Sequence, residues 1–325
     1  MNEPLLSFII PVYNGAEYVE QLYRELIKVS AQGVQLIFVD DCSTDKTTAI
    51  LDRLINRNSH HALVRLPQNC GAGHCRNEGW KLAIGKYTVF FDVDDRPHPE
   101  SILSAIEKLE SNSKADVAVC AYIYERDTPE LGSAMNKEDI KIFDRALGEQ
   151  SSKTFTLEEY SALLMLTNYP WNKIIRTASY KATGMAFGNT KVNNDILGHW
   201  TTLLLANEII ITRDVVCSHI VKSGGINITN QRNETRLAVF EALNQVYDYL
   251  LIHPQIRRRY CHIYWEFATR LLSWSKSRVD KAMHRRFDEL TTELLSRIDL
   301  EDFILIQSRR APGLGNKIKD HFYRG

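Results

Sequence analysis

The sequence has no hydrophobic run long enough to cross a membrane and no excess of charge of either sign. No window approaches the roughly 18 to 20 consecutive apolar residues that a bilayer requires. The N-terminal MNEPLLSFIIPVYN lacks the basic and small-residue regions of a secretory signal. The 40 lysines and arginines equal the 40 aspartates and glutamates in number, which removes the usual electrostatic reason for nucleic-acid binding. We therefore expect no membrane-spanning helix and no nucleic-acid partner.

Cysteine is sparse, with six residues in a chain of 325 and no CxxC spacing. Disulfide scaffolds and zinc sites need denser or closely paired cysteines, so we expect reduced thiols, no zinc and a cytoplasmic location. The hydrophobic share of 44% and the charged share of 25% are typical of a globular protein. The six thiols are those of Cys42, Cys70, Cys75, Cys120, Cys217 and Cys261.

Short apolar runs alternate with stretches of helical periodicity through the first half of the chain. The runs occupy residues 5–13, 34–41, 61–69 and 87–95, and apolar residues at helical spacing follow each of them. This alternation predicts an α/β fold, with a mostly parallel central sheet covered by helices on both faces.

The rest of the chain divides by its patterning. Residues 128–153 are polar and charged, and we expect a surface loop there. From about residue 235 the periodicity is helical. We expect a ligand-binding half at 1–125, a second half of the same domain at 126–234, and a helical extension at 235–325.

Polar residues gather where the four predicted strands end. These ends are Pro11 to Asn14, Asp40-Asp41, Gln68-Asn69 and Asp92 to Asp95. The carboxyl ends of parallel strands meet at one edge of an open α/β sheet, which is where ligands bind. An aromatic ring can stack on a base, and carboxylates can accept hydrogen bonds from base N–H or ribose hydroxyl groups. The sequence therefore predicts a nucleotide pocket at this edge.

Three carboxylates after the fourth strand, Asp92, Asp94 and Asp95, predict a divalent cation. A diphosphate tolerates several carboxylates beside it only if a hard cation bridges them, and Mg²⁺ or Mn²⁺ with oxygen ligands does so. The glycines at 71–73 precede a helix that carries Arg76, whose charge could reach the phosphates. The alternative for the three acids is a solvated turn, but the wholly apolar run before them argues against it.

Four motifs in order, FIIPVYN, FVDDCSTDKT, QNCGAGHCRNEGWKLAIGKY and VFFDVDD, resemble the inverting family 2 glycosyltransferases with the GT-A fold. The resemblance covers about the first 125 residues strongly. Beyond them, YPWNKIIR and the segment around Asp195 resemble the acceptor half of that family more loosely.

The resemblance assigns the nucleoside pocket. It implies that Pro11 and Tyr13 contact the base, that Asp41 bonds the uracil edge, and that Asp40 orients it or shares the nucleoside. Cys42 stands where the family often has glycine.

The resemblance also assigns the cation. Asp92 matches the first acid of the family's DxD motif, near the ribose and the metal, and Asp94 matches the second, which usually coordinates Mn²⁺ or Mg²⁺. Asp95 could be an additional ligand.

The family's mechanism needs a carboxylate that deprotonates an acceptor hydroxyl. This base usually belongs to a Glu-Asp pair, and here the corresponding place reads Asn193-Asn194-Asp195, so only the aspartate remains. Asp195 is the candidate base, and His199, one helical turn later, could orient it, share the proton transfer or contact the acceptor. The alternative for Asp195 is a structural acid at a helix N-terminus.

Two further side chains have both functional and structural interpretations. Trp171 could line the acceptor pocket and stack on a sugar face, or it could belong to the core. His219 could reach the diphosphate or the metal, although a lone histidine is more often structural.

Basic residues outnumber acids between 257 and 286, where five aromatic residues are interleaved. Such a segment could contact an anionic membrane surface, or it could be a packed helix with a solvated basic face. The nine basic residues are Arg257, Arg258, Arg259, Arg270, Lys276, Arg278, Lys281, Arg285 and Arg286.

The resemblance implies a metal-dependent inverting glycosyltransferase that moves a sugar from a nucleotide-sugar, with UDP as the expected nucleotide. The acceptor would be a hydroxyl of a glycan or lipid-linked glycan, in cell-surface polysaccharide or lipooligosaccharide synthesis at the cytoplasmic face of the membrane. Residues 1–125 would bind the donor and 126–234 the acceptor. One alternative is a catalytically inactive nucleotide-sugar-binding scaffold, because the glutamate is absent. A nucleotidyltransferase fits less well, because PVYNGAEYVE lacks a glycine-rich basic loop after the first strand.

Overall fold

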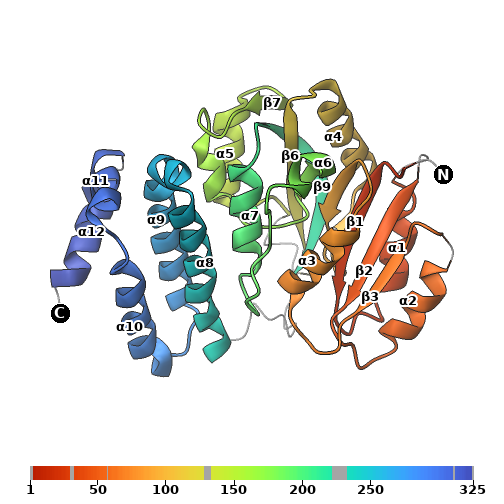
Figure 1. The fold of residues 1–325 in the computed structure, drawn as a ribbon, viewed down its shortest axis with the longest axis horizontal. Helices are drawn as coiled ribbons and strands as arrows, with labels where there is room; N and C mark the ends of the chain where they lie inside the picture. The colour runs from red at the N-terminus through yellow and green to blue at the C-terminus, as the bar shows by residue number, and fades with distance from the viewer. Residues whose placement is uncertain are drawn as a thin grey trace.

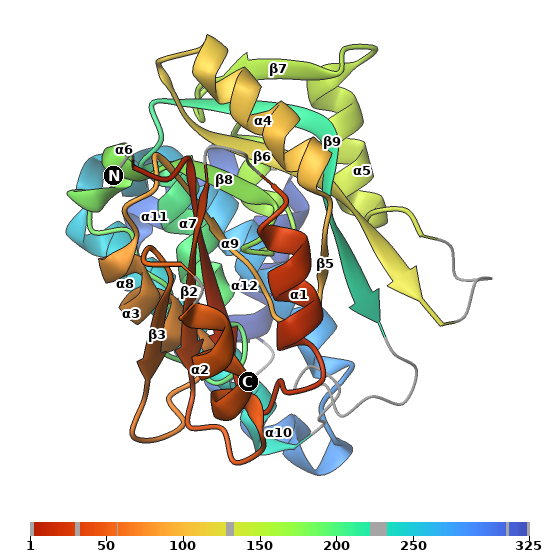
Figure 2. The same ribbon diagram turned by 90° about the vertical axis from the view of Figure 1, so that its right-hand side faces the viewer.

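The computed structural model describes residues 3–29, 33–56, 58–127, 133–221, 233–309 and 312–323. Its nine-stranded sheet has the order β3-β2-β1-β4-β8-β6-β9-β5, and β7 pairs with β9 (Figures 1 and 2). The strands of the first half are β1 (Leu6–Val12), β2 (Val34–Asp40), β3 (Ala62–Arg65) and β4 (Tyr87–Phe90). They pair in parallel, as the alternation of strand and helix predicted.

The second half of the sheet is mixed. Strand β8 (Lys173–Arg176) runs antiparallel to both of its neighbours, β4 and β6 (Ala115–Arg126). Strand β9 (Glu208–Val221) is parallel to β6, while β5 (Arg96–Pro97) and β7 (Ser152–Phe155) pair antiparallel with it. The sheet is thus parallel throughout only in its N-terminal part.

Apolar side chains of β1 point to both faces of the sheet, because helices cover both. Phe8 and Ile10 pack in one core with α1 (Val19–Leu26), α2 (Thr47–Ile55) and α4 (Pro99–Ser111). Ile9 between them belongs to the other core, with α3 (Ala72–Leu82) and α7 (Asp195–Leu204). A strand buried on both faces is apolar without alternation, as this one is.

The C-terminal part is helical, and its helices pack in the same core as Ile9, α3 and α7. Figure 1 shows these helices as a layer beside α7, at the end of the molecule opposite β1 to β3. The layer begins after the short 3₁₀ turn η4 (Glu234–Leu237). Its helices are α8 (Ala238–Ile252), α9 (Pro254–Lys276), α10 (His284–Leu295), α11 (Leu300–Arg309) and α12 (Pro312–Tyr323), with η5 (Lys281–Met283) before α10.

The expected loop at 128–153 contains a helix, α5 (Lys137–Leu147), which corrects the sequence prediction. Residues 128–132 lie outside the described residues. Asn136 caps the helix by accepting a hydrogen bond from the Glu138 backbone N–H. Phe143 and Leu147 bury one face of it. A 3₁₀ turn, η2 (Ser161–Met165), follows β7, and α6 (Thr177–Lys181) follows β8.

In the described part of the chain, no helix is both long and apolar enough to span a bilayer.

Candidate active site

The predicted polar edge of the sheet exists, and hydrogen bonds tie its first two loops together. The Asn14 backbone N–H donates to Ser43 Oγ at 2.8 Å, and the Thr44 backbone N–H donates to Asn14 Oδ1 at the same distance. The ring of Tyr13 is half exposed beside them. Pro11, in contrast, is buried within β1 opposite Val39. Tyr13 is therefore the residue of this pair that can offer a ring face to a ligand.

Asp41 organises the neighbouring loop after β3. Its two carboxylate oxygens accept the backbone N–H groups of Cys70 at 2.7 Å and Gly71 at 2.8 Å. Asp40 is buried, and one of its oxygens accepts the Ser43 N–H at 3.3 Å, while the other has no hydrogen-bond partner. A buried carboxylate oxygen without a partner is unfavourable unless another group satisfies it. The two acids thus hold the pocket loops, and each carboxylate oxygen retains lone pairs for a ligand.

The backbone conformation at Cys42 is one that glycine adopts most easily, which agrees with the expected glycine at this position. Its backbone has a φ of 63°, in the left-handed region. Glycine adopts this conformation without a steric penalty, whereas residues with a Cβ rarely do. The turn after Asp41 is therefore kept here at some conformational cost.

Arg76 joins the two halves of the site. Its buried guanidinium donates to Asp92 Oδ1 at 2.6 Å and to Asn194 Oδ1 at 2.7 Å. Asp92 follows β4, and Asn194 is the residue before α7. The planar fork of arginine suits two acceptors at once. The sequence predicts that Arg76 reaches the phosphates and that Asn194 replaces a glutamate. No local signal predicts that these two side chains bond to each other.

Asp95 is committed to an internal contact, which counts against its prediction as a metal ligand. The His219 ring Nδ1 lies 2.8 Å from Asp95 Oδ1 and 3.1 Å from Oδ2, and the Ile220 backbone N–H donates to Oδ1. The Asp95 side chain is almost fully buried, whereas Asp94 is exposed. Asp95 therefore orients His219 instead of facing the ligand side of the site.

His219 is held close to all three acids. Burial opposes its protonation, but the hydrogen bond to Asp95 and the negative charges of Asp92 and Asp94 raise the pKa of the imidazole above its ordinary value. A histidine anchored through one ring nitrogen by a carboxylate presents the other nitrogen in a fixed direction, as metal-binding histidines do.

Asp195 begins α7 and is half-buried. Burial raises the pKa of its carboxyl group to about 6, against the opposing positive charges of Arg76 and Lys173, while Asp92 adds to the rise. An acid whose pKa lies near 6 is suited to accept a proton at neutral pH. The bridge through Arg76 and Asn194 brings the start of α7 to the acids after β4.

The structure corrects the predicted acceptor contacts of Trp171 and His199. Trp171 is only 1% exposed and stacks on Tyr169 with ring centroids 4.4 Å apart, so its indole cannot receive a sugar. His199 is 2% exposed, and both of its ring nitrogens are buried without a hydrogen-bond partner. Tyr169 and Tyr124 are partly exposed and join their hydroxyls at 3.2 Å, which makes them the better candidates for an acceptor wall.

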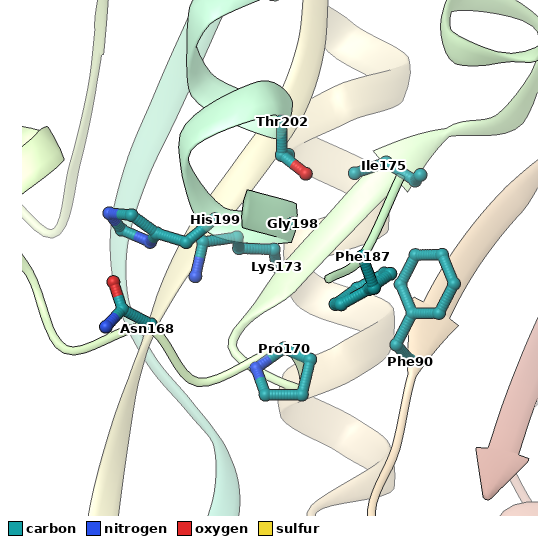
Figure 3. Close-up of a pocket in the computed structure, with 9 residues that line it drawn as sticks. All are labelled: Phe90, Asn168, Pro170, Lys173, Ile175, Phe187, Gly198, His199 and Thr202. Carbon is teal, nitrogen blue, oxygen red and sulfur yellow. The ribbon is translucent and has the colours of Figure 1, made fainter. Parts of the chain in front are cut away.

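His199 lines a small internal pocket below the start of α7 (Figure 3). The pocket holds about 10 Å³, which is roughly the space of one water molecule and too little for a sugar. Its lining residues are Phe90, Asn168, Pro170, Lys173, Ile175, Phe187, Gly198, His199 and Thr202.

A close backbone approach fixes α3 against the segment before α7. A Cβ built on Gly73 would lie 1.8 Å from the Gly188 carbonyl oxygen, so only glycine fits there. The Gly188 N–H in turn donates to the Asn194 carbonyl oxygen at 2.9 Å. Gly71, at a φ of 89°, caps the N-terminus of the same helix. These contacts set the reach of Arg76 to Asn194.

The three acids do not form a complete metal cage. Among the described residues, no group of three or more histidine, cysteine, aspartate or glutamate side chains has a metal-binding arrangement. Mg²⁺ commonly binds through one or two carboxylates together with substrate phosphates. The arrangement of Asp92, Asp94 and His219 fits such a shared site better than a site built from protein ligands alone.

Comparisons with known proteins agree with the fold. A family model described as glycosyl transferase family 2 matches residues 7–184. An uncharacterized glycosyltransferase of Haemophilus influenzae is 40% identical over 95 residues, which cover 29% of this chain and 38% of that protein. The poly(ribitol-phosphate) beta-N-acetylglucosaminyltransferase TarS of Staphylococcus aureus is 26% identical, covering 69% of this chain and 37% of TarS. The chain thus spans under two fifths of the length of these two curated relatives.

A solved structure extends the likeness to nearly the whole chain. The crystal structure of residues 1–349 of S. aureus TarS in complex with UDP-GlcNAc superposes with a TM-score of 0.75 at 20% identity. It covers 98% of this chain and 87% of that one, including the helices after β9. With the family model matching more than half of the sequence, the chain belongs to glycosyl transferase family 2 and has the GT-A fold.

Proposed function

We propose that this protein transfers a sugar from a nucleotide-sugar, with UDP as the nucleotide, to a hydroxyl of a glycan or lipid-linked acceptor with inversion. The observation that carries the proposal is the Arg76 bridge, which joins Asp92 to the segment that carries Asp195. The UDP-GlcNAc complex of the TarS neighbour supports the choice of UDP. The name of TarS, poly(ribitol-phosphate) beta-N-acetylglucosaminyltransferase, supports a polymer as the acceptor class. A cell-surface polymer made at the cytoplasmic face of the membrane is part of the proposal.

The chain's own residues account for donor binding and proton removal. Tyr13 would stack on the base, while Asp40 and Asp41 would accept hydrogen bonds from the nucleoside. Asp195 would take the proton of the acceptor hydroxyl. The acceptor oxygen would then form a bond to the anomeric carbon as the bond to the diphosphate breaks on the opposite face, which inverts that carbon.

A divalent cation, Mn²⁺ or Mg²⁺, belongs to the proposal. Asp94 and Asp92 would hold it with diphosphate oxygens, and His219 could add a nitrogen ligand, since Asp95 fixes its other nitrogen. Such a cation would neutralise the charge of the departing diphosphate.

A thermal-shift panel tests donor and cation together. UDP-, GDP-, CDP- and dTDP-sugars would be added with and without Mn²⁺. We expect stabilisation by a UDP-sugar only when the cation is present, and its loss in Asp94→Ala. Asp52→Ala is the matched control, because Asp52 is an exposed acid on α2 that pairs with Arg65. No stabilisation by any sugar nucleotide at millimolar Mn²⁺ would reject the proposal.

The second candidate is a nucleotide-sugar-binding scaffold without turnover. Asn194, which accepts from Arg76 where the family usually has glutamate, favours it. Release of UDP from a bound UDP-sugar distinguishes the two, because a scaffold would be stabilised by the donor and release none.

Contact with an anionic membrane remains a proposal for the basic C-terminal helices. Six of the nine basic residues between 257 and 286 form ion pairs with acids, which neutralises much of that surface. Co-sedimentation with vesicles should rise with the fraction of anionic lipid and fall with salt. Vesicle binding that does not change with the fraction of anionic lipid would reject the proposal.

A further inference from the structure

Lys173 is a buried cation without a direct ionic partner. Its side chain is 4% exposed, and its ammonium donates to the Tyr169 carbonyl oxygen at 2.7 Å and to Asn172 Oδ1 at 2.8 Å. Both acceptors are neutral, and among the described residues no carboxylate lies within ion-pair distance of it. A buried charge is costly unless another charge compensates it.

The lysine lies below the helix that begins with Asp195. It extends from β8 along the pocket of Figure 3, whose other wall is formed by Gly198, His199 and Thr202 of α7. Asp195 is one turn before His199 on the same helix. The pocket admits about one water molecule, so little solvent separates Lys173 from Gly198 and His199 of α7.

Two acids act on Lys173, the buried Asp139 and the half-buried Asp195. Asp139 on α5 accepts hydrogen bonds from Tyr122 Oη at 2.7 Å and from the Thr167 N–H at 3.1 Å. Among the described residues, no other side chain donates a hydrogen bond to the Asp195 carboxylate, and Asp195 exerts a larger effect on the lysine than Asp139 does. Burial lowers the pKa of Lys173 to about 7, and the charges of Asp195 and Asp139 oppose that change.

We propose that Lys173 is a positioning residue for the transfer reaction, whose buried side chain, in its ammonium form, is the counter-charge that keeps Asp195 in its carboxylate form. This inference rests on the proposed role of Asp195 as the base. Two cations act on the Asp195 carboxylate, Arg76 of α3 and Lys173 of β8. Arg76 is already shared by Asp92 and Asn194, whereas no carboxylate in the described part of the chain lies within ion-pair distance of Lys173.

Titratable groups of several elements surround the pair. Asp195 is influenced by Arg76 of α3, by Asp92 after β4 and by Lys173 of β8. Lys173 is influenced by Asp195 of α7, by Asp139 of α5 and by the thiol of Cys120 on β6, and it acts in turn on His199 of α7.

The test measures the titration of Asp195 directly. Carboxyl ¹³C NMR of aspartate-labelled protein, with the Asp195 resonance assigned through Asp195→Asn, would be followed from pH 4 to 9. In Lys173→Met, which keeps an unbranched chain of similar length, we expect the midpoint to move up by about 1 pH unit. The ascending limb of kcat against pH should move by the same amount, with affinity for the donor unchanged.

Lys108→Met is the matched control. Lys108 is also partly buried and pairs with Asp214 at 2.7 Å, but it lies on α4, which covers the opposite face of the sheet. This variant should lose stability without moving the Asp195 midpoint. An unchanged midpoint in Lys173→Met would overturn the inference.

A reciprocal measurement keeps the inference testable if Lys173→Met does not fold. Coupling between two titrating groups is mutual. Lysine ¹³Cε NMR of Asp195→Asn should therefore show the Lys173 midpoint lowered by a similar amount, and no change there would equally refute the coupling. If the Asp195 midpoint shifts but the protein transfers no sugar, the proposed function is rejected, while the electrostatic coupling between Lys173 and Asp195 is supported.

Discussion

Arg76 and Asn194 are 118 positions apart in the chain, and a hydrogen bond of 2.7 Å joins them at the centre of the candidate site. The same guanidinium holds Asp92. One buried side chain therefore sets the distance between the acids that follow β4 and the helix that begins with Asp195. Under the proposed function, this distance decides whether a donor and a base can act on the same acceptor hydroxyl.

Arg76→Lys should disable the enzyme although the charge is kept. A lysine ammonium cannot reproduce the planar fork, so either Asp92 or Asn194 loses its partner. We expect at least a tenfold loss of kcat and a loss of about 2 kcal/mol in the free energy of unfolding, from a buried acceptor left unpaired. Arg53→Lys, in an exposed ion pair with Glu20, is the control and should change neither quantity measurably.

Asp195→Asn should abolish transfer and raise thermal stability at pH 7. Burial raises the pKa of Asp195 to about 6, above its value in the unfolded chain. The free energy of unfolding therefore falls as the pH rises from the unfolded pKa to the folded one, because the acid becomes charged more easily in the unfolded chain. Removing the charge relieves this cost above pH 6. Thermal unfolding should show a higher Tm for the variant at pH 7 and little difference at pH 4. A lower Tm at pH 7 would favour the structural interpretation of this acid.

Transfer by the wild-type protein should fall as the pH drops below about 6. The base must be a carboxylate to accept a proton, and at lower pH an increasing fraction of Asp195 is protonated. Measuring kcat at saturating donor between pH 5 and 8 should give an ascending limb with a midpoint near 6. A flat profile across this range would show that another group removes the proton.

Gly73→Ala should loosen the site from a distance. The added methyl group would overlap the Gly188 carbonyl oxygen, so α3 or the segment before α7 must move. We expect a loss of about 1–3 kcal/mol in the free energy of unfolding, typical of overpacking, and weaker transfer through a displaced Arg76. Gly313→Ala is the control, because nothing lies within 4 Å of the added atom and alanine favours the helix.

Asp302→Ala should weaken the packing of α11 against α8 and α9. Asp302 is fully buried and accepts hydrogen bonds from Tyr247 Oη at 2.7 Å, Trp265 Nε1 at 2.9 Å and Arg257 Nε at 3.0 Å. Its loss removes the acceptor of Trp265 Nε1, leaves Tyr247 Oη with the Arg297 carbonyl oxygen and leaves Arg257 with Asp299 as its remaining ion-pair partner. We expect a cost of about 3–5 kcal/mol by chemical denaturation. Asp288→Ala, which removes an exposed pair with Lys276, should cost under about 1 kcal/mol.

The fold class and the edge of the sheet at which the candidate site lies could be predicted from the amino-acid sequence alone. Mostly apolar runs such as Leu6–Val12, each followed by helical periodicity, indicate strands covered on both faces, and parallel strands place Asp41 and Asp92 at the same edge. The helix α5 escaped prediction because its buried face is a minority of its residues, and propensity alone does not separate such a helix from a polar loop.

Which side chains are exposed to a ligand, and which contact other side chains instead, depends on how the whole chain packs. Trp171, His199 and Asp95 have residue types suited to binding, but packing buries the first two and His219 engages the third. The bridges of Arg76 and the burial of Lys173 join residues far apart in sequence. Contacts of this kind depend on how the halves of the domain dock, because the local sequence around each residue does not contain the position of its partner.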